Sequence, residues 1–219
     1  MVLKIVIRLE QFFVININNE RSFTMKEILD KYNLLCNQRS DINEHLPILK
    51  EYTEKCSTVT EFGVRGIVSS YGFLAGKPKR LFSYDITPPS RHGGNLDIVY
   101  KLTAENNIDY KFIKADTLSI DIEQTDLLFI DTYHAYDQLT QELARHSNKV
   151  NKYIIFHDTV LFGYTDQRYD PISSKKINTQ NKKIGLMPAI LEFLENEDWV
   201  LEKEFKNNNG LLIIKKIIE

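Results

Sequence analysis

The sequence predicts an α/β fold with a doubly wound, mostly parallel sheet of seven strands that is closed by a C-terminal antiparallel hairpin. Short β-rich segments alternate with segments of helical length, which is typical of parallel sheets with right-handed crossovers and helices on both faces. The last two apolar segments, 199–205 and 211–217, instead flank an Asn-Gly turn. That arrangement predicts a hairpin.

The composition is that of an ordinary globular protein. The chain has 219 residues, of which 42% are hydrophobic and 26% charged, so one domain with a sizeable core is expected. Its net charge of −2 argues against nucleic acid or an anionic membrane as a partner. Cys36 and Cys56 form no disulfide framework, and no apolar run is long enough to span a bilayer. We therefore expect a cytoplasmic protein.

Residues 58–74 predict a strand, a glycine turn and a helix in succession. Glu61 and Gly63 lie at the end of the strand, and Gly66 opens the helical segment. Glycines allow a sharp reversal of the chain and a close approach of backbone N–H groups to a ligand. The stretch predicts a nucleotide-type ligand, and a tight turn without any ligand is the alternative.

The next predicted strand, 80–85, ends in Asp85, at about the separation from the glycines at which an acid reaches ribose hydroxyls. The dinucleotide fingerprint is not met, because Glu61 takes the place of its first glycine. A carboxylate beside the turn repels a pyrophosphate and favours a ligand that carries an amino group and a sulfonium. The pattern thus favours S-adenosylmethionine over NAD.

Acidic side chains follow every strand that is predicted to be parallel. Ligands of open α/β sheets bind at the carboxyl ends of the strands. Acids are depleted within strands and also form turns, but their recurrence at each strand end indicates a site. These residues are Glu61, Asp85, Asp116, Asp131 and Asp158.

The remaining segments complete the predicted order. Segments 3–9 and 12–17 alternate as two short strands, and a helix is expected over 25–34. The polar segment 37–47 is predicted to fold over the cofactor site with Arg39, Asp41 and His45 as lining, unless it is only a helix start. Further helices are expected over 96–105, 136–146 and 187–194, and strands over 110–116, 126–131 and 153–158. The long stretch 160–184 is predicted to be a substrate-side loop or a disordered segment.

These motifs resemble those of the class I S-adenosylmethionine-dependent methyltransferases. Residues 61–66 are similar to the first motif of that family, Asp85 to its ribose-binding acid, and Asp116 to the acid beside the adenine. The resemblance implies a Rossmann-like methyltransferase domain over 37–219 that follows a strand-and-helix extension, 1–36. The cofactor-binding residues that it implies are Glu61, Gly63, Gly66, Asp85, Asp116, Thr117, Arg39 and Asp41.

Segments 129–136 and 155–159 resemble small sugar O-methyltransferases of the cephalosporin-hydroxylase-like branch, many of which bind a divalent cation. Asp131 and Asp158 match the acids that follow their fourth and fifth strands, and His157 stands where some members have a second acid. Neighbouring strand ends lie about 5 Å apart. Asp131, Asp158 and His157 are therefore the predicted ligands of Mg²⁺ or Mn²⁺. Such an ion would lower the pKa of an acceptor hydroxyl. His134 is the candidate general base, and Asp131 is the alternative if no metal binds.

Segments 39–47 and 61–66 also resemble methyltransferase domains of viral and bacterial glycan-building enzymes, including chlorovirus enzymes that methylate a terminal rhamnose. That resemblance implies a sugar acceptor and a larger multidomain protein, in the host cytoplasm if it is viral. An NAD-dependent oxidoreductase or epimerase is the first rival, disfavoured by Glu61 and by the lack of a Tyr-x-x-x-Lys pair. A non-catalytic binding module is the second. A nucleic-acid methyltransferase is disfavoured because no Asn-Pro-Pro-Tyr motif follows the fourth strand.

Overall fold

The structure is a computed structural model that describes residues 25–167 and 183–217. The predicted strands 3–9 and 12–17 lie outside the described residues, and so do residues 168–182 of the long predicted loop. No helix in the described part of the chain combines the length and apolar character that a membrane span requires.

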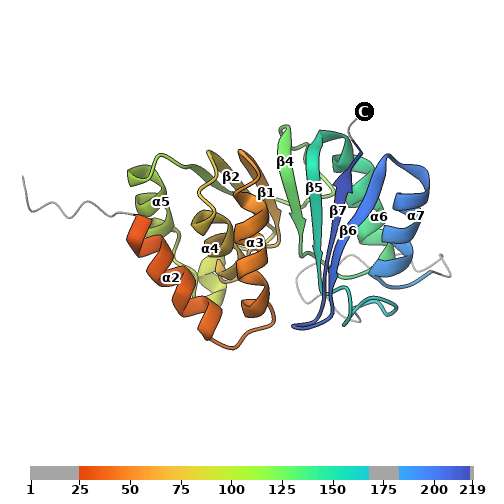
Figure 1. The fold of residues 1–219 in the computed structure, drawn as a ribbon, viewed down its shortest axis with the longest axis horizontal. Helices are drawn as coiled ribbons and strands as arrows, with labels where there is room; N and C mark the ends of the chain where they lie inside the picture. The colour runs from red at the N-terminus through yellow and green to blue at the C-terminus, as the bar shows by residue number, and fades with distance from the viewer. Residues whose placement is uncertain (1–24, 168–182, 218–219) are drawn as a thin grey trace, which may run out of the picture.

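A seven-stranded sheet forms the centre of the molecule, in the order β3-β2-β1-β4-β5-β7-β6 (Figure 1). Strands β1 to β5 are paired in parallel, whereas β7 is antiparallel to both β5 and β6. The predicted fold class is therefore confirmed. The strands are β1 Thr58–Phe62, β2 Arg80–Asp85, β3 Asp109–Lys114, β4 Thr125–Ile130, β5 Val150–His157, β6 Trp199–Phe205 and β7 Leu211–Lys216.

Helices cover both faces of the sheet, with α2 to α5 on one face and α6 and α7 on the other (Figure 1). The helices are α2 Met25–Asn37, α3 Leu46–Thr53, α4 Val68–Ala75, α5 Leu96–Glu105, α6 Tyr136–His146 and α7 Leu186–Asn196. Short 3-10 turns occupy Asn43–His45, Pro89–His92 and Ser147–Lys149. Helix α2 packs against α4 in the same apolar layer, and the predicted division of the chain at residue 37 stays a prediction.

The strands supply an apolar layer to each face. In β4, Phe129 packs among the helices α2 to α5, and its neighbour Leu128 packs among α6 and α7, as the two-residue period of a strand requires. Residues 127–130 are all buried, which agrees with the near-continuous apolar run expected of a central parallel strand. The central strands are thus buried between two apolar layers, one on each face of the sheet.

The helix after the glycine turn begins later than predicted. It starts at Val68 rather than at Gly66, because Arg65 and Ile67 have left-handed backbone angles, with φ of 46° and 68°. A right-handed helix cannot include such residues. The turn is therefore longer than the sequence pattern suggested, and it reaches to the carboxyl ends of β1 and β4.

The order of the strands reverses between β1 and β4, because β2 and β3 extend to one side and β5 to the other. Such a switch point leaves a crevice outside the carboxyl ends of the strands. The two strand ends meet closely there, since the Asp131 N–H donates to the Phe62 carbonyl at 2.9 Å. The candidate site lies at this edge.

Candidate functional site

The glycine turn lies directly beside the end of β4. Gly63 has φ of +84°, and a Cβ at this position would lie 1.8 Å from the backbone oxygen of Asp131. Glycine is therefore required both by its backbone angle and by the space. Gly66 differs, because its φ is not left-handed and a Cβ would meet the His92 carbonyl oxygen at 3.1 Å.

Asp85 stabilises the turn from the end of β2. Its Oδ2 accepts hydrogen bonds from the N–H groups of Val64 and Arg65, at 2.9 and 3.0 Å. Its Oδ1 accepts from the N–H and the hydroxyl of Thr87, at 2.8 and 3.0 Å. The carboxylate stands beside the turn, where a nucleoside would lie, and its contact with a ribose stays a prediction.

The segment before α3 connects the turn to the acids of the neighbouring strands. Asp41 forms an ion pair with Arg65 of the turn at 2.8 Å. His45 is fully buried and meets the ring of His157 edge-on, with 5.5 Å between the ring centres. Arg39 is exposed. Asp41 thus contacts the glycine turn and His45 contacts His157, while their contact with a cofactor stays a prediction.

Glu61 points into the protein interior. Its carboxylate is fully buried and accepts hydrogen bonds from the hydroxyls of Ser69, Ser70 and Ser83, at 2.5, 2.7 and 2.5 Å. The sequence pattern suggested a carboxylate that faces a ligand, but serines of α4 and β2 enclose it instead. Burial raises the pKa of Glu61 to about 7, against the smaller opposing effect of the three serines. Its contact with a cofactor stays a prediction.

The raised pKa of Glu61 predicts a pH-dependent stability. Because the folded state holds this proton more tightly than the unfolded chain, the free energy of unfolding should fall as the pH rises from about 4.5 to about 7. The wild type should lose on the order of 1–3 kcal/mol of its free energy of unfolding over that range, and Glu61→Gln should not show this loss. Urea unfolding at several pH values measures it, with the exposed Glu105→Gln as the control. Equal slopes for Glu61→Gln and the wild type would contradict it.

Glu142 is a buried acid that sequence reasoning missed. It accepts hydrogen bonds from the hydroxyls of Thr117 and Thr132, at 2.6 and 2.9 Å, and from the amide of Gln138 at 2.9 Å. Burial raises its pKa to about 7. Its place three residues after the core residue Leu139 of α6 was the available signal. Glu142 joins the loop after β3 to the loop after β4.

Asp116 follows β3, as predicted. Its Oδ1 accepts the N–H of Leu118 at 3.0 Å, which shapes the loop that begins there. Thr117 is buried, and its carbonyl meets the ring nitrogen Nε2 of His146 at 2.8 Å. The structure thus places Asp116 at the predicted edge of the sheet and turns the Thr117 side chain into the interior toward Glu142.

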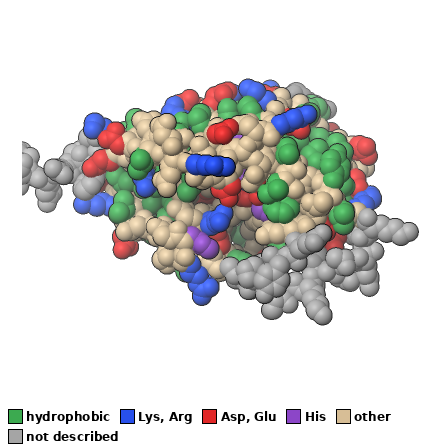
Figure 2. Space-filling model, turned by 90° about the horizontal axis from the view of Figure 1, so that it is seen from below, with side chains coloured by type: hydrophobic (Ala, Val, Ile, Leu, Met, Phe, Trp, Pro, Cys, Tyr) green, Lys and Arg blue, Asp and Glu red, His purple; other side chains and the backbone are tan. Residues whose placement is uncertain are grey.

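Asp131, His134 and Asp158 converge at the ends of β4 and β5. Nε2 of His134 lies 3.1 Å from Oδ1 of Asp131 and 3.2 Å from Oδ2 of Asp158. One ligand atom from each of the three residues falls within 4.8 Å of the other two. Figure 2 shows acidic and histidine side chains at the bottom of a hollow on this face, with basic side chains around it.

His134 is held between the two acids and the loop that follows β5. Its Nδ1 lies 2.9 Å from Oε1 of Gln167, and its ring stacks on Phe162 with 4.8 Å between the ring centres. Burial alone would lower the pKa of His134, but the hydrogen bond and charge of Asp131, with the charge of Asp158, raise it above its ordinary value. Both aspartates therefore favour a proton on this ring.

Asp131 and Asp158 differ in their ionisation. The pKa of Asp131 lies below its ordinary value, because the charge of His157 and the hydrogen bond from His134 outweigh its burial. The pKa of Asp158 is raised by burial and by the charge of Asp131. Asp158 also has a left-handed backbone with φ of 58°, and its Oδ1 is buried with no hydrogen-bond partner among the described residues. Such strain at the end of a strand is frequent in functional sites.

His157 does not belong to the group of three ligand atoms, although the sequence predicted it as a ligand. It lies on the α2 to α5 face of β5, because it follows Ile155 by two residues, and its ring turns toward His45. Its Nδ1 is 3.5 Å from Oδ1 of Asp131 and 3.4 Å from Oδ1 of Asp158. Although burial opposes it, the charge of Asp131 raises the pKa of His157 to about 9.

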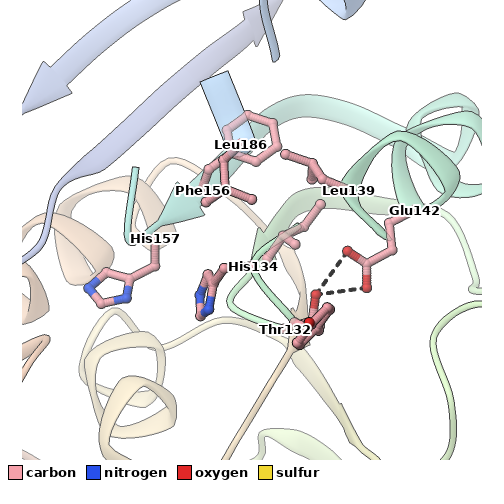
Figure 3. A pocket seen from close by; sticks show the side chains of 9 residues that line it. Thr132, His134, Leu139, Glu142, Phe156, His157 and Leu186 are labelled. Atoms are coloured by element: carbon pink, nitrogen blue, oxygen red, sulfur yellow. Dashed lines mark hydrogen bonds between the residues drawn. The ribbon is translucent and has the colours of Figure 1, made fainter. Parts of the chain in front are cut away.

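A pocket of about 220 Å³, its open mouth included, adjoins this cluster (Figure 3). Apolar side chains form part of its walls, and Thr132, Tyr133, Glu142 and the two histidines supply polar groups. It is smaller than most ligand sites, so it adjoins the crevice rather than holding a whole cofactor. The lining residues are Ile130, Thr132, Tyr133, His134, Leu139, Glu142, Phe156, His157 and Leu186.

The turn between β6 and β7 completes the site from the C-terminal side. Asn208 accepts the Glu44 N–H at 2.9 Å and donates to the Ser40 carbonyl at 2.8 Å. The carbonyl of Asn209 accepts the N–H groups of Val160 and Leu161 at 2.9 and 3.0 Å. The hairpin was predicted, but its contacts were not, and they link the segment before α3 to the loop that follows Asp158.

The comparisons with known proteins identify relatives of the fold alone. No family model matches the sequence, and no curated protein matches it. A Corynebacterium glutamicum protein aligns at a TM-score of 0.56 and 13% identity over 98% of both chains. An O-methyltransferase from Bacillus cereus, in complex with S-adenosylhomocysteine (SAH), aligns at a TM-score of 0.53 and 14% identity over 96% of this chain and 97% of its own.

A methyltransferase from Podospora anserina, also bound to SAH, aligns at a TM-score of 0.55 and 11% identity over 87% of this chain and 88% of its own. At such low identity the likeness concerns the arrangement of helices and strands. The chain therefore has the Rossmann-like fold that these two methyltransferases share.

Proposed function

We propose that this protein is an S-adenosylmethionine-dependent O-methyltransferase that acts on a small hydroxylated acceptor. The observation that supports this most is the contact between the glycine turn and the Asp131 backbone, which brings a nucleotide-type turn next to a cluster of two acids and a histidine. Methyl transfer needs the methyl donor and the acceptor oxygen in line and in contact. A cofactor at the glycine turn and an acceptor at the cluster would be neighbours in this way.

The cofactor would lie across the ends of β1, β2 and β3. The turn around Gly63 would face the cofactor from the end of β1, while Asp85 would meet the ribose and Asp116 the adenine. Asp85 already accepts two hydrogen bonds from the turn and two from Thr87, so ribose hydroxyls would share its oxygens. Bound in this way, the cofactor supplies an electrophilic methyl group.

A divalent cation fits the acids of the cluster. Oδ1 of Asp158, which accepts no hydrogen bond from the described residues but lies 3.4 Å from Nδ1 of His157, and the nearby Asp131 carboxylate are hard oxygen donors, which suit Mg²⁺ or Mn²⁺. We propose these two aspartates as its ligands, without His157, because the His157 ring turns toward His45 and lies outside the group of three ligand atoms. Bound there, the ion would lower the pKa of an acceptor hydroxyl.

His134 is proposed as the general base. Its Nε2 faces both aspartates, at 3.1 and 3.2 Å, and would be within reach of a hydroxyl that is held beside Asp131 and Asp158. Asp131 and Asp158 hold the ring and stabilise the proton that it receives. The acceptor is proposed to be a sugar, including a terminal rhamnose, since the motifs around Asp131 and Asp158 resemble those of sugar methyltransferases and polyhydroxyl groups suit a paired-acid site.

Calorimetric titration with S-adenosylhomocysteine, with and without Mn²⁺, tests the proposal, and NAD serves as the control ligand. We expect S-adenosylhomocysteine to bind both with and without Mn²⁺. Turnover with a panel of glycosides should then increase with Mn²⁺. Binding of NAD in its place would reject the methyltransferase assignment.

Asp85→Ala is expected to weaken S-adenosylhomocysteine binding by about tenfold or more, because it removes a charged hydrogen-bond acceptor and loosens the turn. Calorimetry measures this loss. Asp109→Ala, which removes an acid at the opposite edge of the sheet, is the control and should bind normally. Unchanged affinity in Asp85→Ala would exclude a ribose contact.

A further inference from the structure

Gln167 makes four contacts with the dipeptide Tyr133-His134. Its N–H donates to the His134 carbonyl at 2.7 Å, and its own carbonyl accepts the Tyr133 hydroxyl at 2.5 Å. Its side-chain Oε1 faces both the N–H and the Nδ1 of His134, at 3.3 and 2.9 Å. The loop after β5 is thereby joined to the loop after β4 at the residue proposed as the base.

These contacts determine which nitrogen of His134 carries a proton. A backbone N–H can only donate, so the side-chain atom of Gln167 that faces it must be the carbonyl oxygen. Nδ1 of His134 shares this oxygen and must donate to it as well. The other nitrogen, Nε2, takes no part in these contacts and points at Asp131 and Asp158, at 3.1 and 3.2 Å.

Rigid elements hold Gln167 in its place. The preceding residue, Asp166, accepts the N–H of Tyr136 at the start of α6 and that of Gly185 at the start of α7, at 3.1 and 2.6 Å. Phe162 of the same loop stacks on the imidazole at an angle of 14° between the ring planes. The imidazole is thus fixed on one face by an aromatic ring and at one edge by a carboxamide.

We propose that Gln167 is a positioning residue that fixes His134 with Nδ1 protonated and Nε2 directed at the acceptor. The inference rests on the proposed function of His134, but the proton position is a property of the free protein. A base whose tautomer and orientation are set by a third group needs no rearrangement before it accepts a proton.

Nuclear magnetic resonance of protein labelled with ¹⁵N in its five histidines tests the proton position directly. The His134 signals are assigned by their loss in His134→Asn. We expect the wild-type Nδ1 signal to be that of a protonated nitrogen that donates to Gln167. Gln167→Ala should expose this proton to faster exchange and mix the tautomers, and Gln167→Glu, which keeps an acceptor oxygen, should preserve the wild-type pattern. An unprotonated Nδ1 in the wild type would overturn the proposal.

Kinetics supply the second test. Gln167→Ala should lower kcat about 10- to 100-fold with unchanged S-adenosylhomocysteine affinity, and Gln167→Glu should recover most of the loss. Gln141→Ala, on the exposed face of α6, is the matched control and should be fully active. Full activity of Gln167→Ala would also overturn the positioning role. A wild type that neither binds the nucleoside nor turns over would reject the proposed function and leave the spectroscopic result standing.

Discussion

Replacement of His134 by asparagine is expected to lower kcat by about 10²- to 10⁴-fold, the usual contribution of a general base. The variant loses the nitrogen that lies 3.1 and 3.2 Å from the two aspartates, while the glycine turn and Asp85 are untouched. S-adenosylhomocysteine affinity should therefore stay at its wild-type value. Single-turnover rates with a methylated glycoside product as readout, together with calorimetry, separate the two effects.

If the His134→Asn variant stays active, Asp131 rather than His134 would be the general base. Asp131→Asn then becomes the informative comparison, because it removes the negative charge that holds the imidazole and keeps the size of the side chain. If His134 is the base, both variants should lose turnover, and Asp131→Asn should also weaken any response to Mn²⁺. A loss confined to Asp131→Asn would indicate direct proton transfer to that carboxylate.

Gly63→Ala is expected to destabilise the protein by about 4 kcal/mol or more, which is exceptional for a single substitution. The added Cβ would lie 1.8 Å from the Asp131 carbonyl oxygen, and neither backbone can move without breaking the pairing of β1 with β4. The left-handed φ adds strain. Urea unfolding measures the loss, and we expect little folded protein at 37 °C.

Gly93→Ala is the matched control for that variant. Gly93 has nearly the same backbone angle, with φ of +78°, but no heavy atom lies within 4 Å of a Cβ built on it. Its substitution should cost about 1 kcal/mol, from backbone strain alone. The difference between the two variants measures the clash with Asp131. Similar losses would show that the turn and β4 are not in contact.

The sheet could be predicted because its signals are local. Apolar strands, helical spacing and the Asn-Gly turn each lie within a few residues, and two predicted helices, 96–105 and 136–146, have the observed bounds. The convergence of Asp131 and Asp158 also followed from local patterns, since parallel strands bring their carboxyl ends to one edge. Topology was enough to place these acids.

The finer structure of the site depends on contacts between distant residues, which no local pattern contains. Glu61 was expected to face a ligand, but three serines eight to 22 residues away enclose it. The contacts of Gln167 with His134 span 33 residues, and only the packing of the loop on α6 and α7 creates them. His157 was predicted as a ligand because it stands where some similar sequences have a second acid, and the contact of its ring with His45, which is distant in the sequence, could not be predicted from that pattern.

The turn that bears Asn208 makes the site depend on the order in which the chain is synthesised. Its bonds to Ser40 and Glu44 close loops of 168 and 164 residues, far longer than the local contacts of the parallel strands. Such distant contacts form slowly, because chain entropy must be lost before they are gained. On the ribosome, the glycine turn and both aspartates are made before β6 and β7. We therefore expect a nascent chain to form the glycine turn with Asp85 first. The loop that follows Asp158 should take its final form only after the hairpin of β6 and β7 has docked.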